Sequence, residues 1–301
     1  MRWTILERPE KALRRITTIY SNGNGIMQKK SFVLCGLTCI AGIFGALIRW
    51  LQSTTAFEPE TGLHQPFSMW SVILTLYLVL AAVVFFVVVR WLKGNKKLTQ
   101  PMNYPEAFLG GPAMCSASGF AAFAMIAAGG VITLVDAIRN PKPSYSVLGP
   151  AHSYFDHVNG ALAVVAALCV LMLLRNINSS EKKSGAMPLV VIDLYLCFRL
   201  IAEYRSAAAD PVVWNFAIRI IAISVSILAY YYFAGYAFDK AQPFKTLYFS
   251  LLGMFLGIIA LADQVSIGYH LISMGILLAQ LVLTILFIGN MALPSHEEKR
   301  V

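Results

Sequence analysis

Charged residues are scarce in this sequence, and their scarcity excludes an ordinary soluble protein. Asp, Glu, Lys and Arg make up 13% of the 301 residues, whereas 58% are hydrophobic. A soluble domain carries about 25% charged residues, and a soluble chain of this length could not bury so much apolar surface in one core. Alternating ten-residue strands are also lacking, which argues against an outer-membrane barrel. We therefore expect a helical membrane protein.

Cysteine and catalytic motifs are equally sparse. The five cysteines lie inside apolar runs and form no CxxC pair, so neither a disulfide framework nor a thiolate zinc site is expected. There is no HExxH, no GxSxG and no nucleic-acid-binding motif. The sequence accordingly predicts no cofactor and no nucleic-acid partner, and no motif in it identifies a family.

Eight apolar runs occupy most of the chain, each long enough to cross a hydrocarbon core of about 30 Å as a helix. They span residues 31–51, 68–92, 110–136, 157–175, 187–206, 212–238, 245–264 and 269–291. Lys and Arg gather before the first run, after the even-numbered runs and at the C-terminus, and the other loops are poor in them. By the positive-inside rule, the sequence predicts an all-α, polytopic integral membrane bundle with eight transmembrane helices and both termini in the cytoplasm. We expect it in the cell membrane.

Three segments follow from this pattern: a basic cytoplasmic arm (1–30), the transmembrane domain (31–292) and a cytoplasmic tail (293–301). The arm reads either as a helix that starts near Pro9 and lies on anionic lipids of the inner leaflet, or as an ordinary disordered tail. Residues 21–25, Ser-Asn-Gly-Asn-Gly, predict a flexible joint. The formal net charge of +9 is explained by these flanking basic residues.

Small residues recur on three runs and predict close helix packing. Gly253 and Gly257 form a GxxxG step, Gly129 and Gly130 lie in a run rich in alanine, and Gly42 lies on the first run. Small residues allow helix backbones to approach closely in lipid. We interpret all three as packing within one bundle, and the oligomeric state is left open.

Ionisable residues inside the bilayer form the main candidate site, because each costs about 2.5–3.5 kcal/mol on insertion scales. Arg199 and Glu203 are four residues apart on the fifth run, and Asn215 and Arg219 are four apart on the sixth, so each pair shares a helix face. Counted from the turn between the two runs, the pairs lie at matching depths near the outer surface. Two acids that end other runs are expected at about the same level; they are Asp136 and Asp263.

Two interpretations of these residues remain open. The first is an outward-facing polar pocket for a small polar or anionic solute, as in a transporter or channel, with the guanidinium groups binding a carboxylate or phosphate. The second is a buried network that only fixes helix packing. As a function class, a non-catalytic membrane sensor or accessory subunit is the alternative to a transporter or channel. An intramembrane metal-dependent hydrolase is a third class, and no catalytic residue is assigned.

Histidine gathers on the expected outer side, where a metal site could be built. The candidate ligands are His152, Asp156, His157 and His270. They are scattered along the chain, no HxxxH pair is present, and Asp156 also suits the first turn of a helix. The sequence therefore gives no committed metal site.

Overall fold

The computed structural model describes residues 9–58, 65, 68–94, 100–108, 113–139, 143–146, 149–152, 154–176, 185–207 and 212–291. Within these ranges, the side chains of residues 9–30, 94, 113, 143–146, 149–152, 154, 206–207 and 215 are not described. All further statements concern the described residues.

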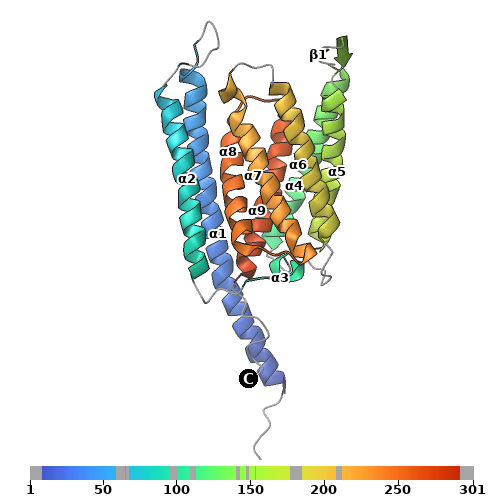
Figure 1. Ribbon diagram of the computed structural model, residues 1–301. Helices are drawn as coiled ribbons and strands as arrows, with labels where there is room; N and C mark the ends of the chain where they lie inside the picture. Colours follow the sequence, from blue (N-terminus) through green and yellow to red (C-terminus); the bar gives the residue numbers. More distant parts are fainter. Residues whose placement is uncertain are drawn as a thin grey trace, which may run out of the picture.

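Eight long helices stand side by side in the described part of the chain (Figure 1). They are α1 (Pro9–Thr55), α2 (Met69–Gly94), α4 (Ala113–Arg139), α5 (Tyr154–Asn176), α6 (Ala186–Ala207), α7 (Ala217–Gly235), α8 (Pro243–Ala260) and α9 (Ile267–Asn290). Shorter elements connect them: α3 (Tyr104–Phe108), the 3₁₀ turns η1 (Val213–Asn215) and η2 (Tyr236–Phe238), and an antiparallel hairpin of β1 (Pro143–Ser146) and β2 (Gly149–His152). Each apolar run of the sequence coincides with one long helix.

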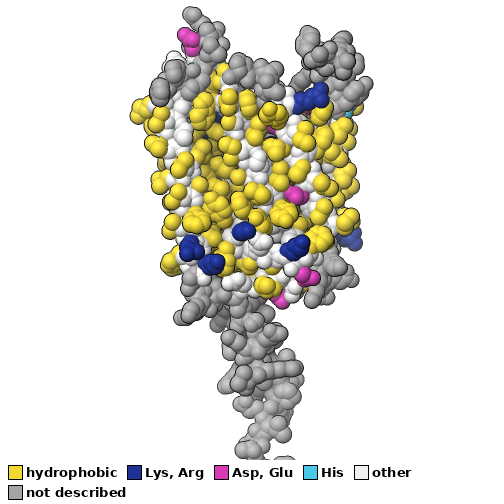
Figure 2. Space-filling view, viewed as in Figure 1, with side chains coloured by type: hydrophobic (Ala, Val, Ile, Leu, Met, Phe, Trp, Pro, Cys, Tyr) yellow, Lys and Arg dark blue, Asp and Glu magenta, His cyan; other side chains and the backbone are white. Residues whose placement is uncertain are grey.

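Seven of these helices, all except α6, are long and apolar enough to cross a membrane. Hydrophobic side chains cover the sides of the bundle as a broad band in Figure 2. α6 differs because it carries several ionisable residues, yet it lies alongside the others and packs against α5 and α7. The chain is thus a multi-pass helical membrane protein, as the composition predicts.

Six helices close into a ring. α4 packs against α5, α5 against α6, α6 against α7, α7 against α8, α8 against α9, and α9 returns to α4. α1 packs against α8 and α9, and α2 packs against α1 and α8, so this pair lies beside the ring. The last residues of α6 and α8 and the first residues of α7 and α9 lie at the same end, which is called the upper end as in Figure 1.

Glycines on α4 explain how the ring closes on both sides of this helix. A Cβ atom on Gly129 would lie 2.7 Å from the Gly268 carbonyl oxygen of α9. One on Gly160 of α5 would lie 2.8 Å from the Gly130 carbonyl oxygen. On α8, Gly253 and Gly257 face Gln280 and Leu277 of α9. The small residues therefore pack within the bundle, which confirms the sequence prediction.

Replacement of Gly160 by Ala is expected to lower the free energy of unfolding by about 1–3 kcal/mol, because overpacking forces backbone shifts. The added methyl group would meet backbone atoms of Gly130 and Leu134, which cannot rotate away. Thermal unfolding of the detergent-purified protein measures the change. Gly36→Ala in α1 is the matched control, since nothing lies within 4 Å of the position that its Cβ atom would take. Equal stability of the two variants would contradict the close approach of α4 and α5.

The first helix corrects one prediction from the sequence. Residues 9–30 belong to α1, in line with the helical one of the two interpretations of the arm, and residues 21–25 are helical and not a joint. Asn and Gly in this stretch each weaken a helix by about 1 kcal/mol or less, too little to interrupt a helix of 47 residues. The short hairpin of β1 and β2 is a departure from the predicted all-α chain.

Candidate functional site

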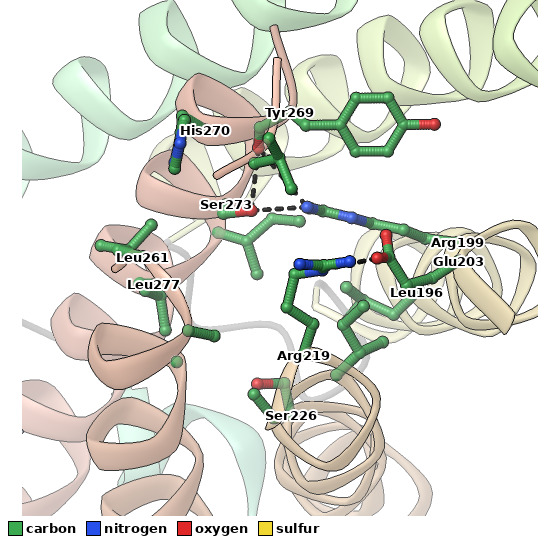
Figure 3. A pocket seen from close by; sticks show the side chains of 16 residues that line it. Leu196, Arg199, Glu203, Arg219, Ser226, Leu261, Tyr269, His270, Ser273 and Leu277 are labelled. Atoms are coloured by element: carbon green, nitrogen blue, oxygen red, sulfur yellow. Dashed lines mark hydrogen bonds and ion pairs between the residues drawn. The ribbon is translucent and has the colours of Figure 1, made fainter. Parts of the chain in front are cut away.

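A pocket lies inside the ring near its upper end, between α6, α7, α8 and α9, and with the adjoining open space it has a volume of about 580 Å³. α6 and α7 face α9 across it, and Figure 3 shows two arginines entering it from these two helices. The lining residues are Leu196, Arg199, Glu203, Arg219, Ala222, Ile223, Ser226, Gly257, Ala260, Leu261, Val265, Tyr269, His270, Ser273, Ile276 and Leu277.

Arg219 is held at the pocket by two carboxylates. Its Nε atom donates to Glu203 Oε1 at 2.6 Å, and its Nη1 atom lies 3.3 Å from Asp263 Oδ2. The Arg219 side chain keeps 19% of its surface exposed, against 7% for Glu203 and 2% for Asp263. Arg219 is thus the ion-pair member that a solute in the pocket can reach.

Asp263 also anchors Arg49, which comes from α1 outside the ring. The Arg49 Nε atom donates to Asp263 Oδ1 at 2.6 Å, and its Nη1 atom donates to Gln52 Oε1 at 2.7 Å. The third donor, Nη2, lies 2.6 Å from the Trp214 carbonyl oxygen. Burial raises the pKa of the Asp263 carboxyl above its ordinary value, although both guanidinium groups act against that rise. We call Glu203, Arg219, Asp263 and Arg49 the ion-pair network.

Arg199 is different, because no carboxylate of the described residues lies within ion-pair distance of it. Only 5% of the residue is exposed. Its Nη2 atom donates to the Ser273 hydroxyl and to the Tyr269 carbonyl oxygen, and its Nε atom is buried without a hydrogen-bond partner. The guanidinium group also lies 5.7 Å from the centre of the Tyr269 ring. Arg199 therefore brings a buried positive charge that only neutral groups contact.

Three of the site residues predicted from the sequence meet in the pocket: Arg199, Glu203 and Arg219 (Figure 3). Asp263 lies directly behind them as a partner of Arg219. Asp136 is exposed at the end of α4 and does not line the pocket. The backbone of Asn215 belongs to η1, but its side chain lies outside the described residues.

The candidate metal ligands are not brought together in the described part of the chain, where no group of three or more His, Cys, Asp or Glu side chains could hold a metal ion. Asp156 accepts a hydrogen bond from the Tyr269 hydroxyl at 3.0 Å. His270 lines the pocket, and Figure 3 shows its ring on the far side of α9 from Arg199. The side chain of His152 lies outside the described residues.

Sequence reasoning missed several members of this site. Arg49 looks like a loop-flanking charge at the end of the first run, and nothing in its neighbourhood points to Asp263, which lies 214 residues away. Tyr269 and Ser273 are four apart at the start of the last run, so they share a helix face. That spacing could have indicated a polar helix face. Without knowledge that Arg199 lies opposite, however, the segment looks like an ordinary apolar helix.

Comparison of the chain with protein-family models, with curated proteins and with solved structures found no match. The contacts described above are therefore the basis for a functional interpretation.

Proposed function

We propose that this protein is a transporter for a small anionic solute, which binds in the upper pocket between Arg199 and Arg219. One observation carries the proposal: a buried guanidinium group lines a pocket and has no carboxylate partner among the described residues. A buried charge without a counter-ion is strongly unfavourable. An anion bound beside Arg199 would supply the missing counter-charge and could also accept a hydrogen bond from its Nε atom.

The charge distribution supports an opening toward the cell exterior. Lys and Arg side chains gather along the lower edge of the apolar band in Figure 2, at the end opposite the pocket. They include Arg90 and Lys93 at the end of α2 and Lys245 at the start of α8. By the positive-inside rule this edge faces the cytoplasm, and the pocket then faces outward. α6 completes eight crossings in this arrangement, so that both termini are cytoplasmic.

Tags at the two ends test the eight-span arrangement. An epitope tag at the N-terminus and another at the C-terminus are expected to be inaccessible to antibody in intact cells and accessible after permeabilisation. An even number of crossings puts both ends on one side, whereas seven crossings without α6 put them on opposite sides. Accessibility of one tag alone in intact cells would therefore show that α6 does not span the membrane.

Arg199→Gln tests the anion site. Isothermal titration of the purified protein with sulfate, phosphate, methanesulfonate and hexanesulfonate is expected to show binding of at least one anion. The Gln variant is expected to bind it about ten- to a hundredfold more weakly, since a hydrogen bond to a charged group contributes about 1.5–3 kcal/mol. Proteoliposomes loaded with the same anion then report exchange across the membrane.

Arg205→Gln is the matched control. Arg205 lies near the upper end of the same helix and is exposed, and its guanidinium group stacks over the Phe155 ring at 4.3 Å. It does not line the pocket, so its loss removes the same charge while leaving the site intact. Equal effects of the two variants, or no binding of any of the four anions, would refute the proposed function. Binding without exchange would instead favour a sensor or receptor.

A further inference from the structure

The lining of the pocket changes character with depth. Toward the upper end lie the charged groups of Arg199, Glu203 and Arg219 and the Ser273 hydroxyl, beside the apolar Leu261 and Val265. One to two helical turns further from that end, α6, α7 and α9 present mainly aliphatic side chains, among them Leu196, Ile223 and Leu277. The pocket thus has a charged upper part and a mainly aliphatic floor, in which Ser226 contributes a hydroxyl group.

Among the described side chains around the upper part, one positive charge has no acidic partner. Among the described residues, three arginines meet two carboxylates there, since Glu203 and Asp263 pair with Arg219 and Arg49 and leave Arg199 without an acid. Asp156 accepts the Tyr269 hydroxyl but makes no ion pair with these arginines among the described residues. A single negative charge on the solute would balance the site.

We infer that the solute is an amphiphilic monoanion, with a singly charged head group between Arg199 and Arg219 and an unbranched apolar tail on the floor. This inference rests on the proposed function and names its solute class. A fully polar anion would leave the aliphatic floor uncovered or filled with poorly bonded water, whereas a tail removes that surface from water. The tail points toward the centre of the bilayer and the head toward the exterior.

The depth of the pocket sets the length of the tail. Arg219 and Ser226 are seven residues apart on α7. At a rise of 1.5 Å per residue, the lining extends about 10 Å along the helices. An extended chain of six to eight carbons is about that long. Below this level, the Tyr230 hydroxyl of α7 donates to the Ile276 carbonyl oxygen of α9 at 3.1 Å and links the two helices.

A series of linear alkanesulfonates tests the inference, because every member is a monoanion at all working pH values. Titration of the full-length protein with methane-, butane-, hexane-, octane- and decanesulfonate is expected to show tighter binding with each added carbon. The gain is about fourfold per methylene group at 0.8 kcal/mol each, and it ends near eight carbons, where the floor is full. Arg199→Gln in the same detergent gives the background from micelle partitioning.

Substitutions in the floor are expected to change the chain length at which the affinity stops rising. Ile223→Phe shortens the floor, so the affinity should stop rising at a shorter chain. Leu277→Ala lengthens it, so the rise should continue further. Both side chains are only half-buried, and either variant alone decides the result if the other does not fold. A shift in optimum chain length is a readout that a general loss of stability does not produce.

The outcomes separate the two proposals. Arg199-dependent binding that does not depend on chain length would overturn the amphiphile while leaving an anion site. Absence of Arg199-dependent binding at any chain length would overturn the proposed function as well. A rise with chain length that is equal in Arg199→Gln would show partitioning into detergent and would also overturn the amphiphile.

Discussion

Replacement of Asp263 by Asn is expected to lower the free energy of unfolding by about 3–5 kcal/mol, the usual effect of removing one member of a buried ion pair. Asp263 is the only acid within ion-pair distance of Arg49 in the described part of the chain, at 2.6 Å, and the side chains are 2% and 3% exposed. The amide keeps the shape of the carboxylate but carries no charge. Arg49 would then have only neutral acceptors, namely the oxygens of Gln52 and Trp214 and the new amide oxygen.

Unfolding of the purified protein by heat or denaturant measures this effect, with Asp239→Asn as the matched control. Asp239 is exposed and has a φ of 54°, a left-handed conformation that Asn adopts readily. The control should therefore stay within about 0.5 kcal/mol of the native chain, as surface substitutions usually do. The same small change in Asp263→Asn would contradict the ion-pair network.

A double variant identifies the cause. Arg49→Met removes the charge that Asp263→Asn leaves without a partner, so the two together should be less destabilising than the sum of the single changes. Residues in one network commonly couple by about 0.5–3 kcal/mol. Additive effects would show that Asp263 acts through Arg219 or through local packing, and not through the link between α1 and the ring.

The sequence predicts the helices well because hydropathy is a property of single segments. It also predicts that Arg199, Glu203 and Arg219 meet, since only a few residues separate the fifth and sixth apolar runs, and residues at equal distances from that gap are expected at equal depths. The contact of Arg49 with Asp263 could not be derived in this way. It depends on how α1 packs beside α8 and α9, and that packing is set by many small contacts far apart in the chain.

The same reason separates the two acids that the sequence treats alike. Asp136 and Asp263 both end an apolar run at the same side of the bundle. Hydropathy and the expected depth in the membrane therefore predict that either acid could pair with the arginines. In the structure Asp263 is buried between Arg49 and Arg219, whereas Asp136 is exposed. Depth along the membrane is readable from the sequence, but the rotation of each helix about its axis requires the packing.

Glu203→Gln is expected to change the preferred charge of the solute. Glu203 is the closer of the two acids that pair with Arg219, with its Oε1 atom at 2.6 Å from Nε. Its neutralisation leaves the pocket with a second uncompensated positive charge. Octyl phosphate carries close to two negative charges at pH 8, since the second pKa of a phosphate monoester is about 6. It should then gain affinity about tenfold relative to octanesulfonate.

Asp136→Asn provides the control for this change, because it also removes one acid at the upper end but from an exposed position outside the pocket. Salt at 0.1 M screens the field of such a solvent-exposed charge within about 10 Å. The ratio of the affinity for octyl phosphate to the affinity for octanesulfonate should therefore stay as in the native chain. A ratio unchanged in Glu203→Gln would mean that bound anions do not reach Arg219. Arg199 would then bind the head group alone, and Arg219 would belong to the helix-packing network with Arg49.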